Sequence, residues 1–204
     1  MKHVLEFSYW QSVLAGAFKP RVPILSYEPH RREAPKHKLQ TPSAWDGIQD
    51  ILADLIERFQ IDRRRCLEFG VEFGFSTVAL SSFFDSVTGV DTFCGDRDTA
   101  NKRDIFEETR ARLIPYPNIE LVRSDYRDFI QQDHGIFDLI HVDIIHTYSD
   151  TLACGLWSAK HSKCSIFHDT ESFPQVKHAV AEVARATRKQ FYNYKGSHGL
   201  GILV

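Results

Sequence analysis

Residues 66–77, CLEFGVEFGFST, constrain the fold of this chain more than any other segment. An apolar run leads into Glu68, and glycines follow at positions 70 and 74. Because glycine lacks a Cβ and tolerates positive φ, the pattern predicts a strand at about 65–69 that turns through a loop into a helix. That helix is expected from about 75 to 84, with Ser76 and Thr77 in its first turn. A ligand can lie close against the backbone of such a loop.

Asp91 ends the next predicted strand, VTGVD at 87–91, and lies 91 − 70 = 21 residues after Gly70. At about this distance, an αβ unit places a carboxylate on a pair of ribose hydroxyls. The loop itself reads E-x-G-x-x-x-G and lacks the middle glycine of the dinucleotide pattern G-x-G-x-x-G. An NAD-dependent oxidoreductase therefore remains an alternative, although the glycine spacing disfavours it.

Strands and helices alternate along the rest of the chain. Apolar runs predict further strands at 119–122, 137–142 and 164–167, and the last two strands are FYNY and GILV. This alternation predicts an α/β fold, a Rossmann-like and mostly parallel seven-stranded sheet with helices on both faces. The connection between the last two strands is short, and only an antiparallel pair accepts it, so the last strand is expected to be antiparallel.

The intervening helices have recognisable start signals. We expect Thr41 to cap the first helix, whose apolar residues from Trp45 to Leu55 fall at helical spacing. A polar helix is predicted over 100–113. Capping-box patterns predict two later helix starts, at Thr147 with Asp150 and at Ser172 with Gln175.

The 204 residues, 43% of them hydrophobic, suit one globular domain. We expect residues 41–204 to form this domain and residues 1–40 to be an N-terminal extension. Prolines at 20, 23, 29 and 35 prevent a long helix there, and basic residues outnumber acidic ones. A substrate lid and a solvated arm are both consistent with this composition.

The bulk properties exclude several classes of function. A net charge of −2 favours neither nucleic-acid nor membrane binding, and no apolar run approaches the roughly 20 residues of a membrane span. None of the four cysteines forms a CxxC pair, which indicates a reducing, cytoplasmic location. A homo-oligomer remains open, because the residues do not fix the oligomeric state.

The glycine loop and Asp91 together resemble the first motifs of class I S-adenosylmethionine-dependent methyltransferases, and the topology of residues 41–204 is similar to theirs. The resemblance implies that S-adenosylmethionine binds outside the carboxyl ends of the strands. Asp91 would hold the ribose and Asp125 the adenine amine, although Asp125 equally suits a helix cap. The implied cofactor-binding residues are Glu68, Gly70, Gly74, Ser76, Asp91, Thr92, Asp125 and Asp143.

The segments HVDIIHTYSD and IFHDT resemble a branch of small-molecule O-methyltransferases. This branch includes metal-dependent macrolide-sugar O-methyltransferases and cephalosporin-hydroxylase-like proteins. The resemblance implies methyl transfer to a hydroxyl of a small molecule, with His146 as the catalytic base. It also implies a divalent cation, Mg or Mn, on Asp143, His168 and Asp169. Such a cation lowers the pKa of a hydroxyl, and a nearby imidazole accepts its proton.

His168 departs from that branch, which has a carboxylate at this position. Mg²⁺ prefers oxygen ligands, whereas imidazole favours ions such as Mn, Fe, Ni or Zn. Three alternatives stay open: Mg²⁺ on Asp143 and Asp169, a softer ion that includes His168, and no metal. The same departure leaves a non-catalytic cofactor-binding protein of this fold as an alternative function. The sequence does not identify the methyl acceptor.

Overall fold

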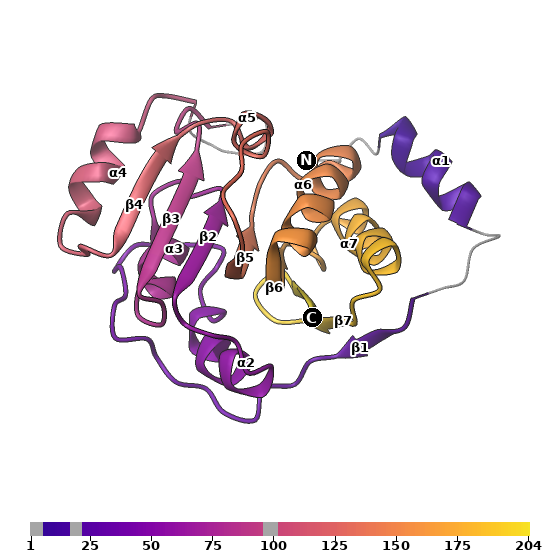
Figure 1. Cartoon of the computed structure of the whole chain (residues 1–204), viewed down its shortest axis with the longest axis horizontal. Helices are drawn as coiled ribbons and strands as arrows, with labels where there is room; N and C mark the ends of the chain where they lie inside the picture. Colours follow the sequence, from indigo (N-terminus) through magenta and orange to yellow (C-terminus); the bar gives the residue numbers. More distant parts are fainter. Residues whose placement is uncertain (1–5, 17–21, 96–101) are drawn as a thin grey trace.

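The computed structural model describes residues 6–16, 22–95 and 102–204, and these fold around one sheet (Figure 1). The sheet has eight strands in the order β1-β7-β8-β6-β5-β2-β3-β4. Strand β8 runs antiparallel to β6 and β7, and the other pairs are parallel. The strands are β1 Ile24–Ser26, β2 Arg65–Phe69, β3 Ser86–Asp91, β4 Ile119–Arg123, β5 Phe137–Val142, β6 Ser162–His168, β7 Phe191–Tyr194 and β8 Leu200–Leu203.

The predicted α/β class and all seven predicted strands are confirmed, and β1 is an eighth strand that the sequence did not indicate. It pairs in parallel with β7, with Ile24 opposite Phe191. Its three residues are all exposed and lie directly after Pro23. So short an edge strand has no alternation of buried and exposed residues, which explains why a proline-rich loop was predicted there.

The helical elements are α1 Phe7–Gly16, η1 Gln49–Ile51, α2 Leu52–Arg58, α3 Phe75–Leu80, α4 Phe106–Leu113, α5 Tyr126–Phe129, α6 Tyr148–His161 and α7 Pro174–Thr187. The predicted cap at Thr41 is wrong, because helical structure begins only at Gln49. Gly47 precedes it with a φ of +97°, a left-handed conformation that a continuous helix does not allow.

Two other predicted helix starts also shift. Ser172 does not cap α7, since its hydroxyl lies 2.9 Å from His198 Nδ1 and Pro174 occupies the first position of that helix. The polar helix predicted over 100–113 is α4 from Phe106 onward, and residues 100–101 lie outside the described part of the chain. The cap at Thr147 is confirmed, because its side chain accepts from the amide of Asp150.

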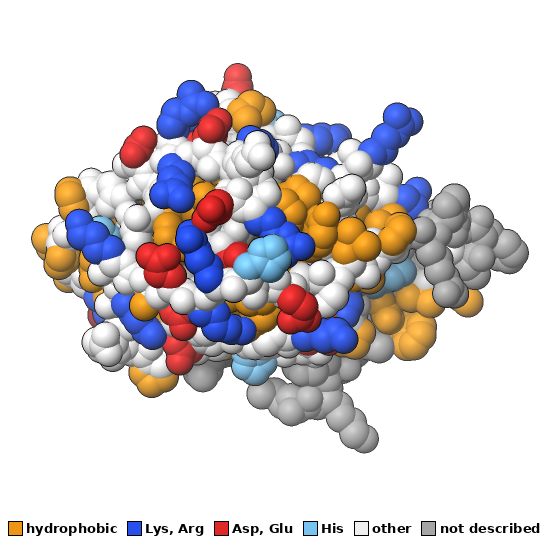
Figure 2. Space-filling model, turned by 90° about the horizontal axis from the view of Figure 1, so that it is seen from below, with side chains coloured by type: hydrophobic (Ala, Val, Ile, Leu, Met, Phe, Trp, Pro, Cys, Tyr) orange, Lys and Arg blue, Asp and Glu red, His pale blue; other side chains and the backbone are white. Residues whose placement is uncertain are grey.

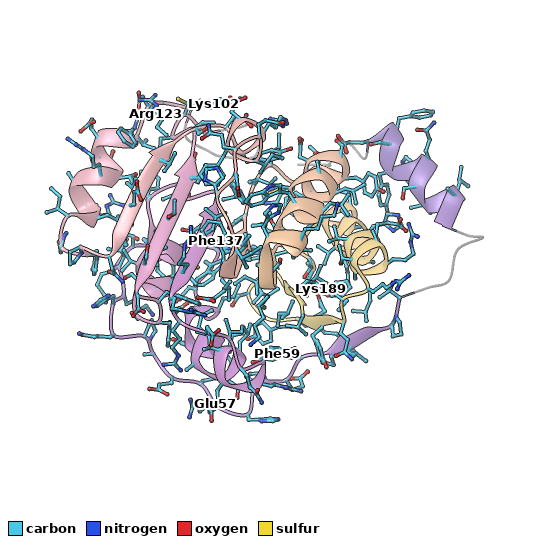
Figure 3. All side chains as sticks on the ribbon, in the orientation of Figure 1. Glu57, Phe59, Lys102, Arg123, Phe137 and Lys189 are labelled. Atoms are coloured by element: carbon cyan, nitrogen blue, oxygen red, sulfur yellow. The ribbon has the colours of Figure 1, made fainter. Side chains whose placement is uncertain are left out.

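Helices cover both faces of the sheet, as predicted. One buried cluster joins α2 and α3 to the strands through residues such as Leu55 and Ala79, and a second joins α5, α6 and α7 through residues such as Phe129 and Val180. Figure 3 labels a buried and an exposed side chain of the sheet. Phe137 on β5 belongs to the second buried cluster. Arg123 at the end of β4 is exposed and pairs with Asp104 at 2.6 Å. No helix within the described residues has the length and apolar character that crossing a bilayer requires.

The segment from residue 22 to residue 40 packs onto the domain. Tyr27 is fully buried, and its hydroxyl donates to Asp54 at 2.6 Å. Several basic residues of the segment are paired: Arg31 contacts Glu57 at 2.6 Å, and Lys38 contacts Asp46 at 3.4 Å. Basic and acidic side chains accordingly intermingle on the face shown in Figure 2. Residues 17–21 of the predicted extension, which include Pro20, lie outside the described residues.

Candidate functional site

A cavity of about 770 Å³ opens at the carboxyl ends of the central strands. Its volume lies within the range of small-molecule sites, roughly 300–1,000 Å³. Nine of the eleven predicted site residues line it: Gly70, Ser76, Asp91, Thr92, Asp125, Asp143, His146, His168 and Asp169. The topology therefore brings most of the predicted residues together at one edge of the sheet.

Gly70 holds the tips of β2 and β5 against each other. Its φ is +89°, and a Cβ at this position would lie 1.8 Å from the carbonyl oxygen of Asp143. Any larger residue would therefore separate the two strand tips. Gly74 does not line the cavity; it adopts a φ of +84° as the N-cap of α3, and a Cβ there would meet Leu113 at 2.6 Å.

Asp91 fastens the glycine loop to the end of β3. Its Oδ2 accepts from the backbone N–H groups of Val71 and Glu72, both at 2.8 Å, and its Oδ1 accepts from Phe93 N–H at 2.7 Å. A carboxylate offers about four acceptor positions, so one remains for a ligand in the cavity. The predicted ribose contact is thus compatible with a second role in shaping the loop.

The place of Asp125 suits both roles that the sequence left open, a helix cap and a contact with the cofactor. It caps α5, because its side chain accepts from Arg127 N–H at 2.8 Å, and it also lines the cavity. The guanidinium of Arg127 lies 3.0 Å from the same carboxylate.

Glu68 lies away from the cavity, contrary to its predicted place in the cofactor site. It is fully buried, its Oε2 accepts from the Thr77 hydroxyl, and its Oε1 lies 2.8 Å from His141 Nδ1. Its carboxylate is therefore occupied by contacts between β2, α3 and β5.

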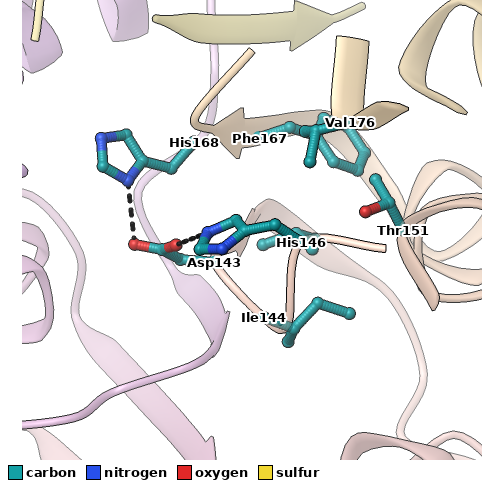
Figure 4. Close-up of a pocket in the computed structure, with 8 residues that line it drawn as sticks. Asp143, Ile144, His146, Thr151, Phe167, His168 and Val176 are labelled. Carbon is teal, nitrogen blue, oxygen red and sulfur yellow. Dashed lines mark hydrogen bonds and ion pairs between the residues drawn. The ribbon is translucent and has the colours of Figure 1, made fainter. Parts of the chain in front are cut away.

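Four polar side chains from the end of β6 and the loops that follow β5 and β6 converge at the other end of the cavity. Figure 4 shows three of them, Asp143, His146 and His168. Asp143 Oδ2 lies 3.1 Å from His168 Nδ1, and Asp143 Oδ1 lies 3.8 Å from His146 Nε2. Asp169 Oδ2 is 2.8 Å from His146 Nε2 and 3.4 Å from His168 Nδ1. Asp143, His146 and Asp169 offer ligand atoms that all lie within 4.8 Å of one another, an arrangement that fits a metal ion.

The carboxylates and imidazoles of this cluster stabilise one another's charged forms. Burial alone would raise the pKa of Asp143, but the imidazoles of His168 and His146 hold that pKa well below its usual range. Burial alone would lower the pKa of each imidazole, yet the two carboxylates raise the pKa of His146 to about 10 and that of His168 to about 8. Without a metal, both imidazoles therefore carry a positive charge at neutral pH.

Neighbouring residues fix the orientation of the two imidazoles. The ring of His146 stacks on Phe173 at a centroid distance of 4.0 Å, and the Gln175 amide donates to the His146 carbonyl. His168 Nε2 donates to the carbonyl of Ser197 at 3.1 Å. This carbonyl can only accept, so the bond places a proton on Nε2 and leaves Nδ1 facing Asp143.

The sequence did not indicate the strip of residues 41–45, which lines the cavity beside Gly70 and Asp143. Trp45 was assigned to the apolar face of a helix, since its spacing to Ile48 and Ile51 fits one. In the structure it lies in a turn before the first helical residue, and only its position in the fold places it on the cavity wall.

Comparison with known families agrees with this fold. A family model described as a methyltransferase domain matches residues 67–170, which span the glycine loop, Asp91, Asp125 and the polar cluster. No curated protein sequence is significantly similar to the chain.

Solved structures share this fold at low sequence identity. S-adenosylmethionine-bound CalS10, an amino pentose methyltransferase from Micromonospora echinaspora, matches with a TM-score of 0.59 and 12% identity, over 100% of this chain and 99% of its own. DesVI from Streptomyces venezuelae matches with a TM-score of 0.57 and 13% identity, over 76% and 89%. An O-methyltransferase from Bacillus cereus in complex with SAH matches with a TM-score of 0.55 and 18% identity, over 100% and 93%. At such identities the likeness establishes the fold.

Proposed function

Because this chain belongs to a family of methyltransferase domains, we propose that it transfers the methyl group of S-adenosylmethionine to a hydroxyl of a small molecule. The observation that carries this proposal is the shared cavity. Gly70, Asp91 and Asp125 line one part of it, and the cluster of Asp143, His146 and Asp169 lines another.

The strand order suggests how the donor lies. Strands β4, β3, β2, β5 and β6 are consecutive neighbours in the sheet. Asp125 and Asp91 follow or end β4 and β3, so they would bind the adenine and ribose. Gly70 and Asp143 follow β2 and β5, where the sulfonium end would lie. The acceptor hydroxyl would then approach from the side of His146 and Asp169.

When bound, the donor supplies an electrophilic methyl group, and a divalent cation supplies a Lewis acid that lowers the pKa of the hydroxyl. Asp143 and Asp169 would hold the cation, with His168 as a further ligand. His146 would accept the hydroxyl proton as the oxygen bonds to the methyl carbon and the carbon–sulfur bond breaks. Such a positioned base typically contributes about 10²- to 10⁴-fold to the rate.

The charges of the cluster link the protonation of His146 to the presence of a cation. A protonated imidazole cannot accept a proton, and the metal-free pKa of His146 is about 10 because Asp143 and Asp169 face it. A cation on those two carboxylates would offset their effect and return His146 to the neutral form. We therefore include a divalent cation, Mg or Mn, in the proposed function.

Buried free thiols support a reducing compartment for this activity. Cys66, Cys154 and Cys164 are buried and unpaired, and burial raises the pKa of each thiol. We accordingly propose that the protein acts in the cytoplasm on a hydroxyl-bearing metabolite.

The proposal is tested by incubating the purified protein with S-adenosylmethionine and a panel of hydroxyl compounds, and measuring S-adenosylhomocysteine by mass spectrometry. Product is expected with Mg²⁺ or Mn²⁺ and should fall strongly when a chelator is added. If the protein binds the donor but forms no product with any acceptor, it is the non-catalytic alternative. If it binds nicotinamide cofactors instead, the proposal is wrong.

His146 can be either the base or a metal ligand, and one variant separates these roles. If His146 is the base, His146→Ala should lower turnover by about 10²-fold or more while Mn²⁺ affinity, measured by electron paramagnetic resonance, changes little. Asp169→Ala serves as the matched control, because it should lower the Mn²⁺ affinity itself. Loss of Mn²⁺ binding in His146→Ala would make it a ligand.

A further inference from the structure

A chain of buried hydrogen bonds links the glycine loop to the wall of the cavity. Thr77 in the first turn of α3 donates to Glu68 on β2, and Glu68 Oε1 lies 2.8 Å from His141 Nδ1 on β5. The indole Nε1 of Trp45 then donates to His141 Nε2 at 3.2 Å. Three of these four side chains are completely buried, and Trp45 is 2% exposed.

The direction of each hydrogen bond follows from the indole, which can only donate. His141 Nε2 must therefore accept and carries no proton. The imidazole proton consequently lies on Nδ1, where it donates to Glu68. Each polar atom of the chain thus has one matched partner, and the ring of Trp45 has a fixed position relative to the sheet.

This series of buried hydrogen bonds lies directly below the tips of β2 and β5. Glu68 and His141 are opposite each other in the register of these two strands. Gly70 and Asp143 come two residues later, directly after the ends of these strands, and Gly70 contacts the Asp143 carbonyl. Trp45 therefore sits under the point where β2 meets β5, and it lines the cavity with Gly70 and Asp143.

Desolvating a carboxylate and an imidazole is costly, and apolar residues of similar volume are often at least as stable. A buried polar chain of this kind can instead specify one geometry. Its end point is Trp45, a residue of the cavity wall that is 2% exposed. The face of an aromatic ring attracts a cation by about 0.5–2 kcal/mol. The donor in the proposed function is a sulfonium cation, whereas its product, S-adenosylhomocysteine, is neutral.

We propose that Trp45 forms the aromatic wall that favours the cationic donor over its neutral product, and that His141 is the positioning residue that fixes this wall through Glu68. The inference rests on the proposed function, because it assigns the tips of β2 and β5 to the sulfonium end. It gives Glu68 a role in shaping the site without contacting the cofactor.

The test compares two ligands by calorimetry in the full-length protein. Sinefungin carries an ammonium group in place of the sulfonium, and S-adenosylhomocysteine is the neutral probe. Trp45→Leu should weaken sinefungin binding about 3- to 30-fold more than S-adenosylhomocysteine binding. Trp45→Phe keeps an aromatic face and should leave the ratio of the two affinities near that of the wild type. An unchanged ratio in Trp45→Leu would overturn the proposal.

His141 has a matched pair of variants. In His141→Asn, the amide can still donate to Glu68 from the δ position, but the acceptor for Trp45 is lost. In His141→Gln, an oxygen at the ε position can accept from Trp45 again. We expect His141→Asn to lower the ratio of sinefungin affinity to S-adenosylhomocysteine affinity, as Trp45→Leu does. His141→Gln should restore this ratio. If His141→Asn lowers only the melting temperature and leaves the ratio unchanged, His141 is merely structural.

A measurement with the site intact covers the case in which these buried variants do not fold. The chain has three tryptophans, at positions 10, 45 and 157. With Trp10→Phe and Trp157→Phe, Trp45 alone emits, and saturation with sinefungin should change its fluorescence. No change at saturation would overturn the placement of Trp45. If the wild type binds neither probe, the proposed function fails as well; if it binds both and only the variants disagree, the inference alone fails.

Discussion

Asp91 illustrates how one carboxylate can organise a loop and still face a ligand. Sequence spacing predicts a ribose contact for it, but the spacing gives no sign that its oxygens also accept from Val71, Glu72 and Phe93. Its removal should therefore affect the loop and the ligand together, and a conservative variant is needed to distinguish the two effects.

We expect Asp91→Ala to weaken S-adenosylhomocysteine binding about 10- to 200-fold, since it removes charge-assisted hydrogen bonds worth roughly 1.5–3 kcal/mol. It also leaves three backbone N–H groups without their acceptor, so the melting temperature should fall. Asp91→Asn retains one acceptor oxygen and should lose less stability, while its affinity still falls. Calorimetry and thermal denaturation measure both effects. Unchanged affinity in both variants would contradict the ribose contact.

His146 makes stability depend on pH in the metal-free protein. The folded-state pKa of His146 is raised to about 10 by Asp143 and Asp169, against an ordinary value of 6.5. Folding therefore favours the protonated form, and this stabilisation is fully present below pH 6.5 and lost as the pH rises toward 10. The slope is at most about 1.4 kcal/mol per pH unit.

In chelator, the free energy of unfolding should thus decrease from pH 7 to pH 10, as measured by urea denaturation. His146→Gln cannot take up the proton, and its curve should be flatter over the same range. Parallel curves for the wild type and the variant would show that His146 does not couple to the carboxylates in this way.

At the scale of elements, the sequence predicted the parallel strands closely and the helix starts less well. Strand β5 was predicted with both of its bounds, because an apolar run buried on both faces has sharp polar edges. Thr41 and Ser172 each fit a cap pattern, yet a left-handed glycine at position 47 and a proline at position 174 determine where the helices begin. Pro174 is a signal in the sequence itself that outweighs the capping pattern at Ser172. The conformation of Gly47, in contrast, is not contained in the pattern of residue types.

The candidate site was predictable to the extent that it follows from topology. Residues at the carboxyl ends of parallel strands must meet at one edge, so Asp91, Asp143 and Asp169 were correctly expected on the same side. Which of the strand-end acids face the cavity was not predictable. Glu68 is held away from the cavity by Thr77, nearby in α3, and by His141 on β5, which is distant in sequence. The contact between Trp45 and His141 is likewise distant in sequence.

The start of α6 depends on Asp150, which joins this helix and its N-cap to α5. Asp150 Oδ1 accepts from the Tyr126 hydroxyl at 2.6 Å and from Arg127, and its Oδ2 accepts from the Thr147 hydroxyl at 2.6 Å. Since α6 begins just after His146, this carboxylate also anchors the loop that carries the proposed base.

We expect Asp150→Ala to lower the free energy of unfolding by at least about 2 kcal/mol, because it leaves several donors without their charged acceptor. Thr147→Val removes the helix cap and one donor to Asp150 but leaves the donors of α5 in place, so it should cost less, about 1 kcal/mol. Lys160→Ala, at an exposed position of the same helix, is the control and should stay within about 0.5 kcal/mol of the wild type. Denaturant titration measures all three. A cost for Asp150→Ala no greater than that of Thr147→Val would contradict its joining role.

At the scale of the whole molecule, the predicted boundary at residue 40 raises the question of where the domain begins. Helix α1 has no buried residue. Together with the preceding Glu6 it contacts the rest of the described chain through hydrogen bonds, Glu6 with Ser149 and Ser12 with Tyr148, and through the ring of Tyr9. Beyond it, β1 adds to the sheet, Tyr27 is fully buried, and Arg32 donates to the Tyr194 hydroxyl at 2.7 Å. These contacts suggest that the cooperative unit includes residues from about 22 onward.

Two truncations test this boundary by thermal denaturation and S-adenosylhomocysteine binding. Removal of residues 1–21 takes away no buried side chain among the described residues 6–16, so the melting temperature should fall by a few degrees and the affinity should change little. Removal of residues 1–40 also deletes the buried Tyr27, a loss of about 3–5 kcal/mol for a large aromatic side chain. At about 2–4 °C per kcal/mol for a chain of this size, the melting temperature should fall by roughly 6–20 °C. Tyr27→Ala in the full chain should reproduce most of that fall. If the shorter protein, residues 41–204, keeps the stability of the full chain, residues 22–40 are a dispensable arm and the original boundary at residue 41 is correct.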